Sequence, residues 1–164
     1  MVAKKHQVAQ SHVFLLKQDV AVRGMEIHGE EVVPASSLSN YERIFDHLHL
    51  DHDCEITTVS VAHVNGYSLR ENVTVFMEWN DEFPVFGCVQ QVLLVNCKIH
   101  LVIQPWKTRW FSRHYHAYGV EKNARDELKV KTPSELRDNK PVHVVNSYDP
   151  DDANHYVAVR FQLS

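Results

Sequence analysis

The sequence predicts a mainly β domain with minor α content, built as a bent sheet or small β-barrel with one amphipathic helix near residues 40–50. Short segments with a two-residue hydrophobic period recur from residue 54 onward, and polar turns separate them. Only one segment has clear helical spacing. Several short strands at regular spacing are typical of closed or strongly bent antiparallel sheets. The chain has 164 residues, of which 44% are hydrophobic, so one domain can bury a sizeable core.

The N-terminal part has the least regular pattern. Residues 12–23 are compatible with a strand pair or with an irregular entry segment. Residues 24–37 contain two glycines, a proline and paired serines, which are typical of a turn-rich connection. We therefore expect a turn-rich N-terminal entry segment over residues 1–37, followed by a single β-rich domain over residues 38–164.

The predicted helix begins at a recognisable cap. Ser39-Asn40-Tyr41-Glu42 fits a capping box, in which the serine oxygen and the glutamate carboxylate accept hydrogen bonds from free backbone N–H groups. Apolar residues then follow at helical spacing and form one face: Tyr41, Ile44, Phe45 and Leu48. This pattern predicts a helix from about Asn40 to Leu50.

Strand patterns dominate the rest of the chain. Asn65-Gly66 is a strong hairpin-turn signal. A weak helical pattern covers residues 121–129, and Thr132-Pro133-Ser134-Glu135 is a second capping box that predicts a short helical turn. The expected strands are residues 56–63, 73–79, 85–95, 98–103, 113–120, 142–145 and 155–163.

Charge and cysteine content restrict the partners and the compartment. The formal net charge is −4, so any affinity for nucleic acid has to come from a local patch. The three cysteines have no zinc-binding spacing, which favours buried thiols in a reduced intracellular protein. We expect no signal peptide, because the N-terminal residues have no apolar stretch, and no membrane span, because the apolar runs are short.

One histidine-rich string suggests a metal site. Residues 47–52 read H-x-H-x-D-H, which resembles the zinc motif of the metallo-β-lactamase fold. Imidazoles and a carboxylate are good zinc ligands, and a zinc-bound water is a nucleophile near neutral pH. However, the string follows an amphipathic helix instead of a buried strand, and the later Gly-His and Gly-Asp elements are absent. A polar helix end is the favoured interpretation. The residues of the alternative zinc site are His47, His49, Asp51 and His52.

The usual signatures of enzymes are missing from the sequence. It has no nucleophile elbow, phosphate-binding loop, dinucleotide fingerprint or H-E-x-x-H motif. Cys88 or Cys97 with a distant histidine would make a thiol dyad, but both lie in apolar, strand-like sequence that favours core thiols. We expect no catalytic residues and no cofactor, with zinc as the alternative.

A basic and aromatic segment is the main candidate for binding. Residues 98–120 contain no acidic residue, whereas cations and aromatic side chains alternate through them. This composition suits phosphate contact with base stacking, and it equally suits a protein interface anchored by aromatic and arginine side chains. If residues 113–120 form a strand, one of its faces joins the cations of the preceding loop. The predicted contact residues are Lys107, Arg109, His114, His116 and Tyr118.

Three short stretches suggest a family. These are Pro84-Val85-Phe86-Gly87-Cys88-Val89, residues 111–120, and His155-Tyr156-Val157-Ala158-Val159-Arg160-Phe161. Together they resemble the C-terminal β-rich region of uncharacterised vertebrate proteins associated with transposons. The resemblance implies a nuclear, non-catalytic part of a larger protein and gives no catalytic residues.

We therefore predict a non-enzymatic domain that binds a protein or a nucleic acid through residues 98–118. The alternative is a zinc-dependent hydrolase or metal-binding protein that uses residues 47–52. The sequence leaves the partner and the oligomeric state open.

Overall fold

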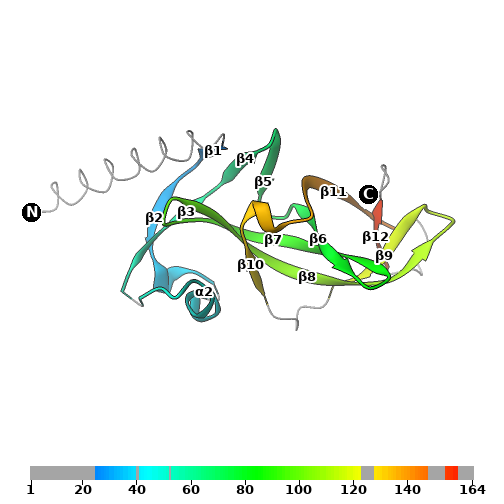
Figure 1. Cartoon of the computed structure of the whole chain (residues 1–164), viewed down its shortest axis with the longest axis horizontal. Coiled ribbons are helices and arrows are strands. Elements are labelled where there is room, and N and C mark those ends of the chain that lie inside the picture. The colour runs from blue at the N-terminus through cyan, green and yellow to red at the C-terminus, as the bar shows by residue number, and fades with distance from the viewer. Residues whose placement is uncertain (1–24, 40, 52, 123–127, 148–153, 159–164) are drawn as a thin grey trace, which may run out of the picture.

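The computed structural model describes residues 25–39, 41–51, 53–122, 128–147 and 154–158. Within these ranges the chain is mainly β, and six strands close into a barrel beside a single α-helix (Figure 1). The predicted fold class is therefore confirmed. Of the other predictions, residues 12–23, residues 159–163 and most of the helical pattern at 121–129 lie outside the described residues.

One long hairpin runs through the whole molecule (Figure 1). Its strands are β7 (Phe83–Val95) and β8 (Lys98–Ser112), which pair antiparallel from Val95–Lys98 to Phe86–Trp106. The turn between them has only two residues, Asn96 and Cys97, with φ angles of 49° and 60°. Two left-handed residues match the right-handed twist of the flanking strands, which explains this tight turn.

The half of the hairpin that is remote from this turn forms part of the barrel wall. Its other strands are β6 (Thr74–Asn80), β9 (Ala117–Glu121), β11 (Asp138–Asn146) and β12 (His155–Ala158). The order β6-β7-β8-β9-β12-β11 closes because β11 pairs with β6. The interior is filled by buried, mostly large side chains: Phe76, Phe86, Trp106, Val120 and Val157.

The other half of the hairpin lies in an open sheet. Strand β3 (Glu55–Val59) pairs with β7, and β2 (Glu31–Pro34) pairs with β3. Strand β10 (Lys129–Lys131) pairs with β8. A separate three-stranded sheet consists of β1 (Met25–His28), β4 (Val61–Val64) and β5 (Tyr67–Arg70) in the order β1-β4-β5.

Both faces of this open sheet are covered. Helix α2 (Tyr41–Leu48) and the short 3-10 turn η1 (Ala35–Ser37) share one buried cluster with Leu93 and Val95 of β7. The neighbouring residues Val92 and Leu94 face the opposite way and pack with the three-stranded sheet. The strict alternation of a strand thus places consecutive apolar residues of β7 in two different cores.

Helix α2 ends in a left-handed residue. His49 has a φ of 52°, and the backbone N–H of Leu50 donates to the carbonyl of Phe45 at 3.3 Å. This arrangement is the Schellman motif that commonly ends helices. The helix predicted over residues 40–50 is confirmed, with bounds at Tyr41 and Leu48.

Two other local predictions are also confirmed. The turn at Asn65-Gly66 joins β4 to β5. Thr132 and Glu135 form the expected capping box at the 3-10 turn η2 (Pro133–Glu135), where the Thr132 backbone N–H donates to the glutamate carboxylate at 2.6 Å. In the described ranges, no helix is long and apolar enough to cross a membrane.

Several stretches differ from the sequence-based prediction. The single strand predicted over 56–63 is two strands, β3 and β4, which belong to different sheets, and β5 and β10 were not predicted. Residues 25–34 form strands β1 and β2, where only turns were predicted, because buried Ile27 gives β1 a core contact. The strand predicted over 113–120 begins only at Ala117, since residues 113–116 form a turn, and β8 extends to Ser112 instead of ending near residue 103.

Candidate interaction surface

Strand β8 changes character at Lys107. From Ile99 to Trp106 most of its side chains are buried, whereas from Lys107 to Ser112 they are exposed or half-buried. Two large hydrophobic side chains are consecutive in this exposed part: Trp110 is 37% exposed and Phe111 is 46% exposed. We call residues 107–118, which are the end of β8, the following turn and the start of β9, the hairpin tip.

A β-bulge sets which way the tip side chains point. Thr108 pairs with Val120 and Trp110 pairs with Gly119, so Arg109 is the extra residue on β8. Val120 belongs to the barrel interior. Lys107 and Trp110 therefore lie on the outer face of the barrel, together with Gly119 and Glu121 of β9. Thr108 and Phe111 lie on the inner face.

On the outer face, Trp110 lies against Gly119. A Cβ atom at position 119 would collide with the Trp110 indole ring. The ring also meets the edge of Tyr156, with centroids 6.2 Å apart, and Tyr115 packs on the same tyrosine at 4.8 Å. Tyr156 is buried, so it is a fixed support for the exposed Trp110 ring and the half-buried Tyr115 ring. Together, Trp110, Tyr115 and Tyr156 form what we call the outer aromatic cluster.

On the inner face, aromatic contacts lead into the barrel core. Phe111 contacts Tyr118 with centroids 5.0 Å apart, and Tyr118 contacts Phe86 at 6.1 Å. Tyr118 is half-buried and packs against the interior cluster. It therefore faces the barrel, not the outward surface on which the predicted strand alternation had placed it.

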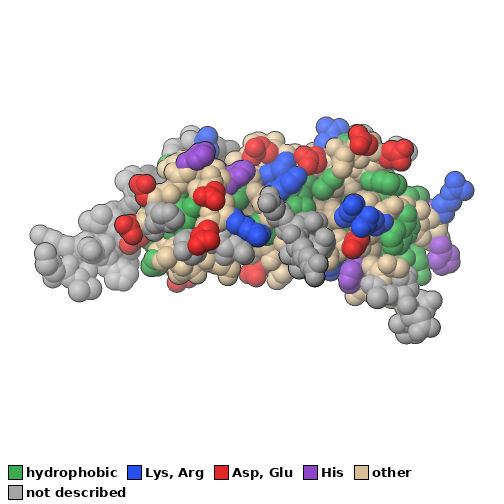
Figure 2. Space-filling model, turned by 90° about the horizontal axis from the view of Figure 1, so that it is seen from below, with side chains coloured by type: hydrophobic (Ala, Val, Ile, Leu, Met, Phe, Trp, Pro, Cys, Tyr) green, Lys and Arg blue, Asp and Glu red, His purple; other side chains and the backbone are tan. Residues whose placement is uncertain are grey.

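The predicted cations lie on the outer face and in the turn. Lys107 is exposed, and the Nε and Nη2 atoms of Arg109 donate to one carboxylate oxygen of Glu121 at 2.7 and 2.6 Å. The turn presents Arg113, His114 and His116 to solvent. At this end of the molecule, Figure 2 shows basic, histidine and hydrophobic side chains side by side.

The two ends of the basic and aromatic segment are far apart. Lys98 and His100 begin β8 in the open-sheet half, and Trp106 is buried in the barrel. Burial lowers the pKa of His100, opposed by the nearby Glu135 carboxylate, and this favours its neutral form. Within the predicted binding segment 98–118, the hairpin tip is therefore the part that remains a candidate contact surface.

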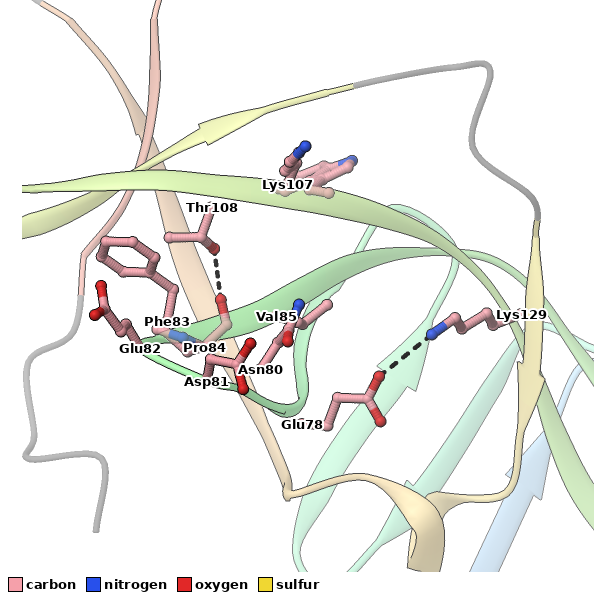
Figure 3. Close-up of a pocket in the computed structure, with 11 residues that line it drawn as sticks. Glu78, Asn80, Asp81, Glu82, Phe83, Pro84, Val85, Lys107, Thr108 and Lys129 are labelled. Atoms are coloured by element: carbon pink, nitrogen blue, oxygen red, sulfur yellow. Dashed lines mark hydrogen bonds and ion pairs between the residues drawn. The ribbon is translucent and has the colours of Figure 1, made fainter.

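A pocket of about 620 Å³ lies beside the tip (Figure 3). Lys129 of β10 forms an ion pair with Glu78 of β6 at 3.2 Å, and Lys131 reaches the other carboxylate oxygen at 3.3 Å. Burial raises the pKa of Glu78, but these two ammonium groups outweigh it and the net pKa is lowered. The lining carries both charge signs, so it selects neither an anion nor a cation. The lining residues include Glu78, Asp81, Glu82, Trp106, Lys107 and Lys129.

The histidine-rich string lies at the end of helix α2. His47 is exposed in its last turn, His49 is the left-handed residue after it, and Asp51 is exposed in the loop that follows. His52 is outside the described residues. Among those described, no group of three or more His, Cys, Asp or Glu side chains is placed to hold a metal ion. The zinc hypothesis stays a prediction.

The three cysteines have intermediate burial, and none of them is in a disulfide. Burial raises the pKa of Cys88 and also that of Cys54, which favours the protonated and less nucleophilic form. The Cys88 thiol points at the carbonyl of Val89, 3.8 Å away. These surroundings are typical of structural cysteines.

The sequence predicted cations and histidines of the tip as contact residues. It did not predict the exposed pair Trp110 and Phe111 as contact residues, or Tyr156 as the support of Trp110. A glycine inside a strand often marks the close approach of another group, so Gly119 was the available signal. Comparisons with protein-family models, curated proteins and solved structures gave no match.

Proposed function

We propose that the chain is a non-enzymatic interaction domain that binds a protein or a nucleic acid through the hairpin tip. The observation that supports this most directly is the exposure of two consecutive large hydrophobic side chains, Trp110 and Phe111, close to exposed Arg113 in the sequence. Aromatic and arginine side chains that are exposed together are the residues most enriched at binding hot spots.

The surroundings of the tip also favour binding. The outer aromatic cluster rests on buried Tyr156, so little side-chain freedom is lost when a partner covers it. Residues 98–120 contain no acidic residue, and this leaves Glu121 as the nearest carboxylate along the chain. An anionic or aromatic partner therefore meets no carboxylate within the tip itself, and the acidic side chains nearby are Asp81 and Glu82 in the pocket beside Lys107.

The resemblance to transposon-associated vertebrate proteins extends this proposal. It leads us to place the domain in a larger nuclear protein, whose other parts contribute their own contacts. Imaging of the full-length protein fused to a fluorescent protein checks the compartment, and exclusion from the nucleus would contradict it.

Site-specific photocrosslinking tests the proposed function without assuming the class of partner. A photoreactive amino acid replaces Arg113 at the tip or, as a matched control, exposed Arg43 on helix α2. We expect discrete crosslinked products in cell extract from position 113 only, and their loss when Trp110→Ala is added. Nuclease and protease treatment of the products separates nucleic acid from protein.

Two results would overturn this proposal. One is the absence of any product from position 113 under conditions in which the protein remains folded. The other is an equal yield from positions 113 and 43, which would indicate random contact.

A further inference from the structure

We infer that the partner of the hairpin tip is single-stranded nucleic acid, bound across the outer face of β8 and β9. This inference rests on the proposed function and specifies its ligand. It is based on a supported aromatic platform, a local excess of cations and an uneven distribution of charge along the molecule.

Trp110 supplies the stacking surface. Its ring lies against the backbone at Gly119 and meets Tyr156 at an interplanar angle of 84°, so it is held in place while 37% of the residue stays exposed. Stacking on an aromatic side chain accepts every base, because each base has a π face. Tyr115, which packs on the same Tyr156 ring, extends this platform toward the turn.

Cations lie on both sides of the platform along the chain. Lys107 and Arg109 precede Trp110, and Arg113 follows it; Arg109 is ion-paired with Glu121 on the neighbouring strand. The hairpin tip itself, residues 107–118, contains these three cations and no carboxylate, whereas Asp81 and Glu82 line the pocket on the side of Lys107. Phosphate groups on either side of a stacked base would meet these side chains.

The end of the molecule that contains helix α2 carries an acidic surface. Exposed carboxylates gather on helix α2 and in the loop after it, and Figure 1 shows that this helix lies far from the β8–β9 turn. An anionic strand is repelled there, and at the tip it is attracted to the side on which Arg113 lies, away from Asp81 and Glu82. These exposed acidic residues are Glu42, Asp46, Asp51, Asp53 and Glu55.

Fluorescence anisotropy with a labelled oligo(dT) of about 12 nucleotides tests this inference. Trp110→Ala should weaken binding about 5- to 150-fold, and Trp110→Phe should restore most of it. Trp79→Ala is the matched control, because Trp79 is 40% exposed but lies on β6. It should leave the affinity unchanged.

A salt series from about 50 to 200 mM tests the phosphate contacts. Lys107→Gln should reduce the slope of log K against log salt by about 0.7, the value for one lost contact to a single strand. Lys98→Gln removes the same charge from the opposite end of the same strand, and it should leave the slope unchanged. A duplex of the same length should bind more weakly, since its bases are already stacked.

Three outcomes would overturn the inference: no binding of the oligonucleotide by wild type at low salt, equal losses for Trp110→Ala and Trp79→Ala, or equal affinity for the duplex. If crosslinking from position 113 persists in any of these cases, the proposed function stands with a protein as the partner. If crosslinking fails as well, both proposals fall.

Discussion

The two halves of the long hairpin differ in how they are covered. In the half next to the Asn96–Cys97 turn, other elements cover both faces of β7 and β8. In the half next to the β8–β9 turn, only the face toward the barrel interior is covered. Helix α2 covers one side of the open sheet and the three-stranded sheet covers the other. At the barrel end, the outer face of β8 carries Lys107, Arg109 and Trp110 in contact with solvent.

This difference shows how one strand supports both the fold and a binding surface. The buried half of β8 fixes the strand, and the barrel then holds its exposed half rigid without covering it. Side chains on the outer face are thus free to change without loss of the core, which is the usual arrangement for binding residues on a stable scaffold. Variants in the two halves test this interpretation.

The largest expected effect is in the barrel core. Phe86→Ala removes a ring that is 0% exposed and contacts Phe76 at 5.7 Å, so the free energy of unfolding should fall by about 3–5 kcal/mol. Phe111 lies at the exposed end of the row of aromatic contacts that includes Phe86, so Phe111→Ala should lower the free energy of unfolding by less than about 1 kcal/mol. Urea unfolding followed by circular dichroism measures both, and equal losses would contradict the division into a packed core and an open tip.

The next effect tests whether the two halves unfold together. Ile44→Ala removes a side chain that is 1% exposed, under helix α2, and should cost about 2–4 kcal/mol. The three tryptophans, at positions 79, 106 and 110, all lie in barrel strands, so their fluorescence reports the barrel half.

Because β7 and β8 run through both halves, the tryptophan transition should shift to lower urea along with the circular dichroism transition. A tryptophan midpoint that stays at the wild-type value would show two independent folding units. The same protein without substitution is the reference for both probes.

A smaller effect comes from the capping box in the open-sheet half. The hydrogen bond from the Thr132 backbone N–H lowers the pKa of Glu135, against an opposing rise from burial. Since the folded-state pKa is below the unfolded one, the carboxylate stabilises the fold above its ordinary pKa, and this contribution is lost as the pH falls through the folded-state pKa.

Glu135→Gln should therefore reduce the free energy of unfolding by about 0.5–1 kcal/mol at pH 7, with the difference shrinking toward about pH 3. Urea unfolding at both pH values measures this. A difference of the same size at both would mean that the hydrogen bond, and not the charge, is what the glutamate contributes.

The fold was predictable where one pattern persists over a whole element. Helix α2 and the capping box at Thr132 have complete local signals, and strands β6 and β7 are rich in apolar residues. Strand β8 loses its alternation at Arg109, because a bulge shifts the phase of the side chains by one residue. Its second half therefore could not be recognised as a strand.

The candidate site was predictable in composition but not in orientation. The cations Lys107 and Arg109 and the exposed His114 and His116 lie at the tip as a group, whereas Tyr118 faces the barrel. A turn at residues 113–116 interrupts the strand on which the alternation was counted. Which rings support each other, such as Trp110 on Tyr156, depends on pairing between distant strands and leaves no local signal.

The smallest expected effect compares the turns at the two ends of β8. Cys97 precedes the strand with a φ of 60°, and His116 lies in the turn after it with a φ of 46°. A left-handed conformation destabilises the folded state by about 1–2 kcal/mol for a non-glycine residue. Glycine avoids this cost, but its greater freedom in the unfolded chain destabilises the folded state by about 0.5–1 kcal/mol. Cys97→Gly and His116→Gly should thus each stabilise the fold by about 0.5–1 kcal/mol.

Only one of the two substitutions should affect binding. Cys97 lies at the open-sheet end, so Cys97→Gly should leave the affinity for the labelled oligonucleotide unchanged. His116 is exposed at the tip, so His116→Gly should weaken binding while it raises the melting temperature. Thermal unfolding and anisotropy on the same preparations separate these effects, because a loss of affinity caused by damage to the fold would be accompanied by a lower melting temperature. Weaker binding by Cys97→Gly would show that the two ends of β8 are not independent.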